Sequence, residues 1–144
     1  MTVSSKFAAV MAVSAVAWAI LGSGVGTATA AGDLYGSIAV APMKVGEATD
    51  YPTQYEADQA ALAACGDGVC HIVARIHNEC GAVAEVDGRT PLGTSPMYFA
   101  GTGRTAAEAE GNALRLAGPN VGTPLLEIVK PAFILDTICT SNAG

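Results

Sequence analysis

Two stretches, TQYEADQAAL at residues 53–62 and TAAEAEGNAL at residues 105–114, follow one pattern and decide the fold. Each opens with T-x-x-E, a capping box in which the threonine oxygen accepts from the third helical N–H and the glutamate reaches back to the cap. Each is followed by a glycine, Gly66 or Gly118, and glycine is common just after a helix. The sequence therefore predicts two helices at equivalent positions of a duplicated unit.

One face of each predicted helix carries small apolar side chains at the i, i+3/i+4, i+7 spacing of a half-buried helix. These faces consist of Ala57, Ala60, Ala61, Ala64 and Cys65 in the first helix and Ala106, Ala109, Ala113, Leu116 and Ala117 in the second. Small side chains allow a helix to lie close to a sheet.

Predicted strands flank both helices. Residues 70–77 alternate between two faces and are rich in β-branched side chains. YGSIAV at 35–40 resembles CGAVAE at 80–85, with glycine second and alanine fifth in both. For the last strand, residues 133–139 compete with residues 125–129. The positions that mark loops are Pro42, Asp87-Gly88, Pro91, Pro96, Pro119, Pro124 and Pro131.

The predicted order is strand, weaker strand, helix, strand, given twice, as expected of an internal repeat. The first repeat covers about 34–79 and the second about 80–140. Packing would place both helices on one face of a mostly antiparallel sheet. We therefore expect an α+β two-layer sandwich built from two ββαβ-like repeats.

All four cysteines, Cys65, Cys70, Cys80 and Cys139, lie in the folded part of the chain, and an even number in an exported protein implies disulfides. Three pairings are available. We prefer Cys65–Cys70, which ties a helix end to the following strand, with Cys80–Cys139, which joins the ends of two antiparallel neighbours. These bridges would stabilise a core that is poor in aromatic side chains.

A zinc site is the alternative use of the cysteines, together with His71. Because Cys70 and His71 are adjacent on a strand, their side chains point to opposite faces, which argues against it. His71 and His77 share a face but lie about 20 Å apart along an extended strand, so they cannot bind one ion together. We predict no metal site and no cofactor.

The segment 1–30 has the order of a secretory signal peptide: a charge at Lys6, an apolar run at 7–21 and an A-x-A site that ends at Ala30. A retained membrane anchor is the alternative, but the run is shorter than the roughly 20 apolar residues that span a bilayer. We expect cleavage after Ala30, a single domain at 31–144 with no integral membrane segment, and a secreted or cell-envelope location.

Composition excludes several classes of protein. The chain has 144 residues with 51% hydrophobic and 14% charged, which excludes wholesale disorder and allows one domain. Its formal charge of −6 argues against nucleic acid as a partner. Ser37, Ser95 and Ser141 lie in no G-x-S-x-G or S-x-x-K motif, so no catalytic residue is predicted.

Three residues near the second helix form a candidate contact patch. Tyr98 and Phe99 follow Pro96 and either pack in the core or lie exposed. Arg104 precedes the helix, where it either completes a plain turn or holds an anion.

A combination of short motifs resembles the family called domain of unknown function 4189, which is typical of secreted proteins from mycobacteria and other bacteria. The motifs are Y-G-S-I-A at 35–39, Cys65-Gly66, C-x-I-V at 70–73, C-G-A-V-A at 80–84 and T-x-x-E-A at 105–109. The resemblance implies an exported, disulfide-bonded domain and supplies no catalytic residues. The chain departs from the family pattern between Val86 and Gly103 and inserts residues 119–132.

The leading hypothesis is an exported, non-enzymatic protein that acts through its surface on an unidentified protein or envelope component. One alternative is a secreted enzyme or inhibitor-like binder that uses a long loop at 87–103. Another is a carrier of a small ligand or a metal.

Amino-terminal sequencing of the exported form is expected to give Ala31 as the first residue, because the A-x-A site ends at Ala30. A protein found only in the cytosol with Met1 intact would contradict this prediction.

Overall fold

The computed structural model describes residues 32–66, 68–119 and 122–144, so the predicted signal segment at 1–30 lies outside the described residues. The secondary structure repeats one order, ββαβ. The first unit contains β1 (Tyr35–Ala41), β2 (Lys44–Tyr51), α1 (Gln54–Cys65) and β3 (His71–His77). The second contains β4 (Cys80–Thr90), β5 (Gly93–Gly103), α2 (Ala106–Ala117) and β6 (Glu127–Cys139).

Both helices begin at the predicted threonines. The hydroxyl oxygens of Thr53 and Thr105 accept from the backbone N–H groups of Glu56 and Glu108, each at 3.2 Å. The carboxylate of Glu108 also accepts from the N–H of Arg104 at 2.9 Å. These bonds satisfy donors that have no partner inside the helix, which is why the two T-x-x-E motifs fix where the helices start.

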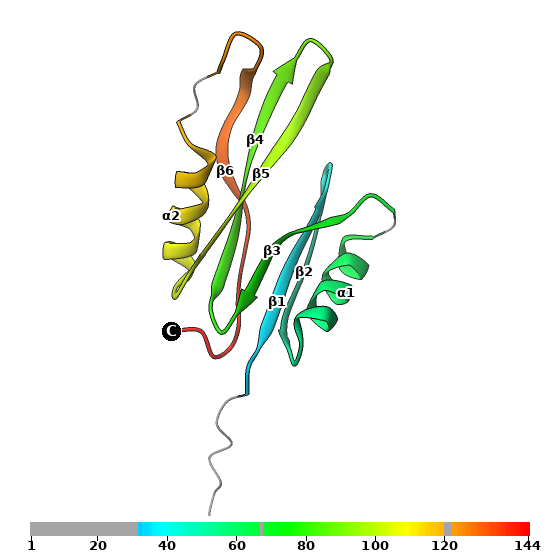
Figure 1. Ribbon diagram of the computed structural model, residues 1–144, viewed down its shortest axis with the longest axis vertical. Helices are drawn as coiled ribbons and strands as arrows, with labels where there is room; N and C mark the ends of the chain where they lie inside the picture. Colours follow the sequence, from blue (N-terminus) through cyan, green and yellow to red (C-terminus); the bar gives the residue numbers. More distant parts are fainter. Residues whose placement is uncertain (1–31, 67, 120–121) are drawn as a thin grey trace, which may run out of the picture.

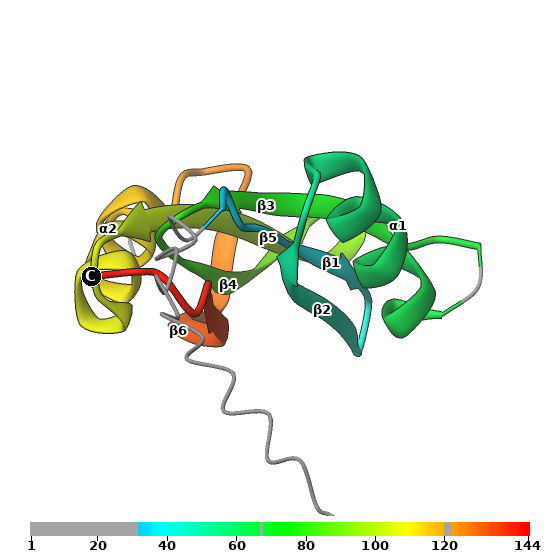
Figure 2. The ribbon, with the colours of Figure 1, turned by 90° about the horizontal axis from the view of Figure 1, so that it is seen from below.

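The strands form two antiparallel sheets, sheet A in the order β2-β1-β3 and sheet B in the order β5-β4-β6. The first strand of each unit is thus the central strand of its own sheet. The sheets pack face to face, and each helix covers the outer face of the sheet of its own unit (Figures 1 and 2). The α+β class, the antiparallel pairing and the ββαβ repeats are therefore confirmed.

The division into two sheets differs from the expected arrangement, in which both helices covered one face of a common sheet. The reason lies in the central strands, whose side chains are apolar on both faces. Ile38 and Val40 of β1 point toward sheet B, whereas Ala39 and Ala41 point toward α1. One helix can cover only one of these faces, so the other face is buried against the second unit.

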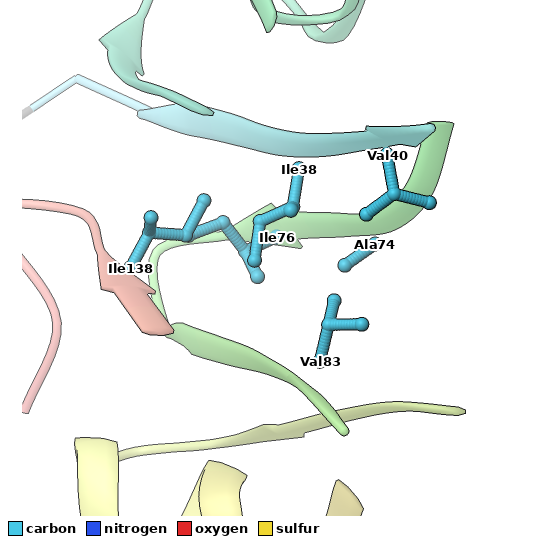
Figure 3. Close-up of a cluster of buried hydrophobic side chains, with 6 residues drawn as sticks. All are labelled: Ile38, Val40, Ala74, Ile76, Val83 and Ile138. Carbon is cyan, nitrogen blue, oxygen red and sulfur yellow. The ribbon is translucent and has the colours of Figure 1, made fainter. Parts of the chain in front are cut away.

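β-branched side chains fill most of the layer between the sheets (Figure 3). The buried members of this inter-sheet layer are Ile38, Val40, Ala74, Ile76, Val83 and Ile138. Burial of such side chains is the main favourable contribution to folding, at about 25 cal/mol per Å² of apolar surface. Because both units contribute to the layer, neither unit has a complete core without the other.

The helix–sheet contacts instead use alanine and glycine. Ala61 and Cys65 of α1, and Ala109 and Ala113 of α2, are fully or almost fully buried against alanines of their sheets. Each helix also passes very close to one strand. A β-carbon placed on Gly46 would overlap the backbone of α1, and one placed on Gly101 would overlap the backbone of α2.

The predicted disulfide pairing is present, and the structure describes no free cysteine. Cys65–Cys70 joins the end of α1 to the residue before β3. Cys80–Cys139 links two residues that lie opposite each other on β4 and β6. Within the described residues, no helix is long and apolar enough to span a membrane.

The expected long loop at 87–103 is wrong. These residues form the distal part of β4, a tight turn and β5, with Thr90 paired to Gly93. Pro96 lies inside β5 rather than in a loop. A proline is tolerated there because β5 is an edge strand with one unpaired side, where no strand needs a hydrogen bond from its backbone.

The two candidates for the last strand are parts of one strand. β6 runs from Glu127 to Cys139 and therefore includes residues 133–139 and most of 125–129. Pro131 lies within it, where the register with β4 shifts between Glu85 and Asp87. A bulge at an edge accommodates a residue that lacks an N–H, so this proline does not end the strand.

Replacing Gly46 or Gly101 with alanine is expected to destabilise the protein by about 1–3 kcal/mol, because the added methyl group overlaps helix backbone that cannot move away. Urea unfolding monitored by circular dichroism measures the change.

The matched control is Gly111→Ala in α2, where nothing lies within 4 Å of the added carbon. Alanine favours the helix there, so this variant should gain roughly 0.5–1 kcal/mol. Equal stability of all three variants would contradict the close helix–strand contact.

Candidate functional site

Sheet B extends beyond sheet A at one end. Its strands are longer than those of sheet A, with 11, 11 and 13 residues against 7, 8 and 7. Figure 1 shows the ends of β4, β5 and β6 projecting past β1 and β3. The distal part of sheet B consists of residues 85–90, 93–98 and 127–133, which pair with one another on the side of the Thr90–Gly93 turn.

Five side chains of this region lie on one face, which we call the distal face. Its members are Glu85, Asp87, Tyr98, Lys130 and Phe133. Glu85 is paired with Tyr98 on one side and with Phe133 on the other, and Asp87 is paired with Lys130. Paired residues and residues two apart share a face of a sheet. The distal face therefore continues the surface that Val83 presents to sheet A.

The two carboxylates of the distal face affect each other. Burial raises the pKa of Glu85 above its usual value, the negative charge of Asp87 raises it further, and the charge of Lys130 opposes the increase. Burial also raises the pKa of the Tyr98 phenol, and the charges of Glu85 and Asp87 add to this effect. Two negative groups thus share one nearby cation, which leaves the face with an excess of negative charge.

Aromatic rings flank the carboxylates. The ammonium group of Lys130 lies 3.6 Å from the centroid of the Phe133 ring, which is a cation–π contact. The Tyr98 ring meets His71 of β3 edge to face, with 6.2 Å between ring centroids. The Tyr98 hydroxyl also donates to the carbonyl of Ala41 at 3.5 Å. Tyr98 therefore fixes the distal face against the edge of sheet A.

A shallow hollow of about 310 Å³ lies farther along sheet B. Its lining consists of Arg89, Thr90, Pro91, Thr123, Pro124, Leu125, Leu126 and Glu127. Arg89 and Glu127 form an exposed ion pair at 3.5 Å across it. Leu125 is 74% exposed, and Leu92, in the adjacent turn, is 100% exposed. The tip of sheet B therefore exposes two leucines beside a neutral ion pair, whereas the distal face has an excess of negative charge.

The structure does not bring the three residues of the predicted contact patch together. Tyr98 packs toward the inter-sheet layer, whereas Phe99 packs on the opposite face beneath α2. Arg104 is exposed at the start of α2. Tyr98 thus belongs to the distal face, and the other two residues lie elsewhere.

Sequence reasoning missed the other members of the distal face. Glu85 and Asp87 alternate with apolar residues, which is a strand signal, but the expected loop after Asp87 hid it. Lys130 and Phe133 join them only through the pairing of β6 with β4. No local pattern in the sequence indicates that pairing register.

Two other groups of polar side chains serve the fold. Fully buried Ser37 donates to Asp58 of α1, which also binds Arg75 of β3 at 2.8 Å. His77 pairs with Asp33 at 3.0 Å and stacks on Tyr35. Among the described residues, no group of three or more His, Cys, Asp or Glu side chains is arranged to hold a metal ion.

A second carboxyl pair lies between the sheets, outside the distal face. Glu47 of β2 and Asp136 of β6 are paired with Ile38 and Val83, so both lie on the faces that the sheets turn toward each other, with Glu47 exposed on an edge strand and Asp136 half-buried. One Asp136 oxygen accepts from the N–H of Thr137 at 2.9 Å, and the other is buried without a partner. Burial raises the pKa of Glu47, and the charge of Asp136 raises it further.

The fold defines a disulfide-bonded α+β protein built from two ββαβ units, with an open face on the longer sheet. The chain belongs to the family described as "Domain of unknown function (DUF4189)", whose profile matches residues 35–122. This match confirms the resemblance found in the sequence. The profile ends before β6, so it covers all of the distal face except Lys130 and Phe133.

Similar proteins occur in mycobacteria. Uncharacterized proteins of two Mycobacterium tuberculosis strains and of Mycobacterium bovis are each 39% identical to the chain over 89 residues. The matched region is 60% of this chain and 56% of each relative, so the chain spans about half the length of the curated relatives it matches. No solved structure matches the chain significantly.

The Glu47–Asp136 pair is expected to make stability depend on pH. The unfolded pKa of Glu47 is near 4.5, and the folded pKa is higher, so the folded protein holds this proton more tightly. The bound proton makes its full contribution to the stability of the folded protein below pH 4.5. This contribution is lost as the pH rises through the folded pKa of Glu47.

Urea unfolding of the wild type and of Glu47→Gln across the acidic to neutral range tests this. As the pH rises, the free energy of unfolding of the wild type should fall relative to that of the variant, because glutamine cannot ionise. Glu79→Gln is the control and should follow the wild type. A constant difference at all pH values would contradict a raised pKa of Glu47 in the folded protein.

Proposed function

We propose that the protein is exported and acts without catalysis, as a binding protein that contacts an envelope or extracellular component through the distal face. The observation that carries this proposal is the row Tyr98–Glu85–Phe133, three residues that the pairing of β4 with β5 and β6 places side by side on one face of sheet B. Rigid strands hold these charged and aromatic side chains in fixed positions, and aromatic side chains are enriched at recognition surfaces.

Export is supported by the cysteines and by the amino-terminal pattern. Both disulfides are of the kind that persists in oxidising compartments outside the cytosol. The signal-like order of residues 1–30 is consistent with such a location. The family description and the mycobacterial relatives name no activity, so they are compatible with a binding role.

The enzymatic alternative has less support. The serine that has a carboxylate partner, Ser37, is fully buried beneath α1, so its hydroxyl cannot reach a substrate. That carboxylate also binds Arg75 and Gln54, so its contacts hold the helix on the sheet. The secreted enzyme or inhibitor-like binder of this alternative would use a long loop at 87–103, but these residues form paired strands.

Charge reversal on the distal face tests the proposed function. Asp87→Arg and the control Glu79→Arg change the charge equally, but Glu79 precedes β4 at the other end of sheet B. Each protein is secreted from its natural host and cross-linked to its surroundings, and the products are identified by mass spectrometry.

We expect the wild type and Glu79→Arg to give the same cross-linked partner and Asp87→Arg to lose it. Unchanged cross-linking by Asp87→Arg would place the binding surface elsewhere. Absence of any stable complex in the wild type would contradict the binding role.

A further inference from the structure

We infer that the distal face recognises a positively charged side chain, above all arginine, presented by a basic segment of a partner protein. This inference rests on the proposed binding role and names the chemistry of the partner. The juxtaposition that carries it is a carboxylate, Glu85, between two aromatic rings, Tyr98 and Phe133, with a second carboxylate, Asp87, in the next row.

The geometry suits a flat cation. Side chains directly opposite on neighbouring strands have β-carbons about 5 Å apart, so a group above Glu85 also contacts the rings on either side. A guanidinium group can donate two hydrogen bonds to carboxylates while its plane stacks on an aromatic ring. A lysine ammonium has the same charge but lacks the planar group with paired N–H donors, so the same surface should bind it more weakly.

The protein's own Lys130 already shows this chemistry. Its ammonium lies 3.6 Å from the centroid of Phe133, and its charge acts on Glu85. Lys130 is exposed and is one cation beside two carboxylates, so an incoming arginine can displace it while the side chain remains in water. The formal charge of −6 would also attract a basic partner from a distance.

The tip of sheet B does not share this chemistry. Leu92 and Leu125 are exposed there, and the adjacent Arg89–Glu127 ion pair has no net charge, so the tip does not select a partner of one charge. The distal face differs because its charge and its rings together define one kind of group.

The probe is a nine-residue peptide with arginine at alternate positions, compared with the same peptide carrying lysine or neutral citrulline. Titration calorimetry gives the affinity, and amide NMR shifts of the ¹⁵N-labelled oxidised protein locate the contact. We expect arginine to bind most tightly, lysine more weakly and citrulline not measurably. The amide shifts should be confined to β4, β5 and β6 at the distal face.

Three variants separate specific recognition from general attraction to an acidic protein. Asp87→Asn should weaken arginine binding by about tenfold, as expected for loss of one charge-assisted contact. Phe133→Leu keeps the charge and should weaken binding severalfold through loss of stacking. Glu79→Gln changes the charge as Asp87→Asn does, and it should leave binding unchanged.

Lys130→Gln gives the sharpest result, because removal of the internal competitor should strengthen arginine binding severalfold. Its control is Arg115→Gln on α2, which loses the same charge away from the distal face. The inference would be overturned if Lys130→Gln and Arg115→Gln changed the affinity for the arginine peptide equally. It would also be overturned if Asp87→Asn and Glu79→Gln did so.

These experiments distinguish failure of the arginine preference from failure of the proposed binding function. Loss of the natural partner by Asp87→Arg, together with no arginine preference in the peptides, would refute the cationic ligand but not the distal face as a binding surface. Specific peptide binding with unchanged partner cross-linking would refute the proposed function and retain the arginine site.

Discussion

The layer of aliphatic side chains between the sheets is the constraint on which the rest of the structure depends. Each ββαβ unit forms a sheet that is apolar on both faces but has only one helix to cover it. The face that presents Ile38, or Val83 in the second unit, can be buried only against the other unit. The two halves are therefore held together by the hydrophobic effect, and the inter-sheet contact determines how one unit packs on the other.

Small residues make the outer layers possible. Gly46 and Gly101 occupy equivalent strands of the two units, and each lies beneath the helix of its own unit. The polar contacts are also equivalent, since Asp58 of α1 bonds Arg75 of β3 and Glu110 of α2 bonds Thr137 of β6. The duplication thus extends from the order of elements to the side chains that hold each helix on its sheet.

The two units differ most in length, and this difference produces the distal face. Sheet A ends where its short strands end, whereas β4, β5 and β6 continue. A continuing antiparallel pair places partner side chains side by side on a rigid surface. The layout shared by the two units therefore supplies the scaffold, and the longer strands of the second unit supply a face that the first unit contacts through Tyr98.

The sequence by itself determined the features that depend on neighbouring residues. The caps at Thr53 and Thr105 fix the helices because side chain and backbone meet within one turn. Alternation and glycine positions likewise revealed the repeated order, and the positions of Cys80 and Cys139 at the ends of two predicted antiparallel strands suggested their bridge. Only the tertiary structure decided that the strands form two sheets and that Glu85 lies between Tyr98 and Phe133. Those facts follow from burial of distant surfaces and from strand register, which local sequence patterns do not specify.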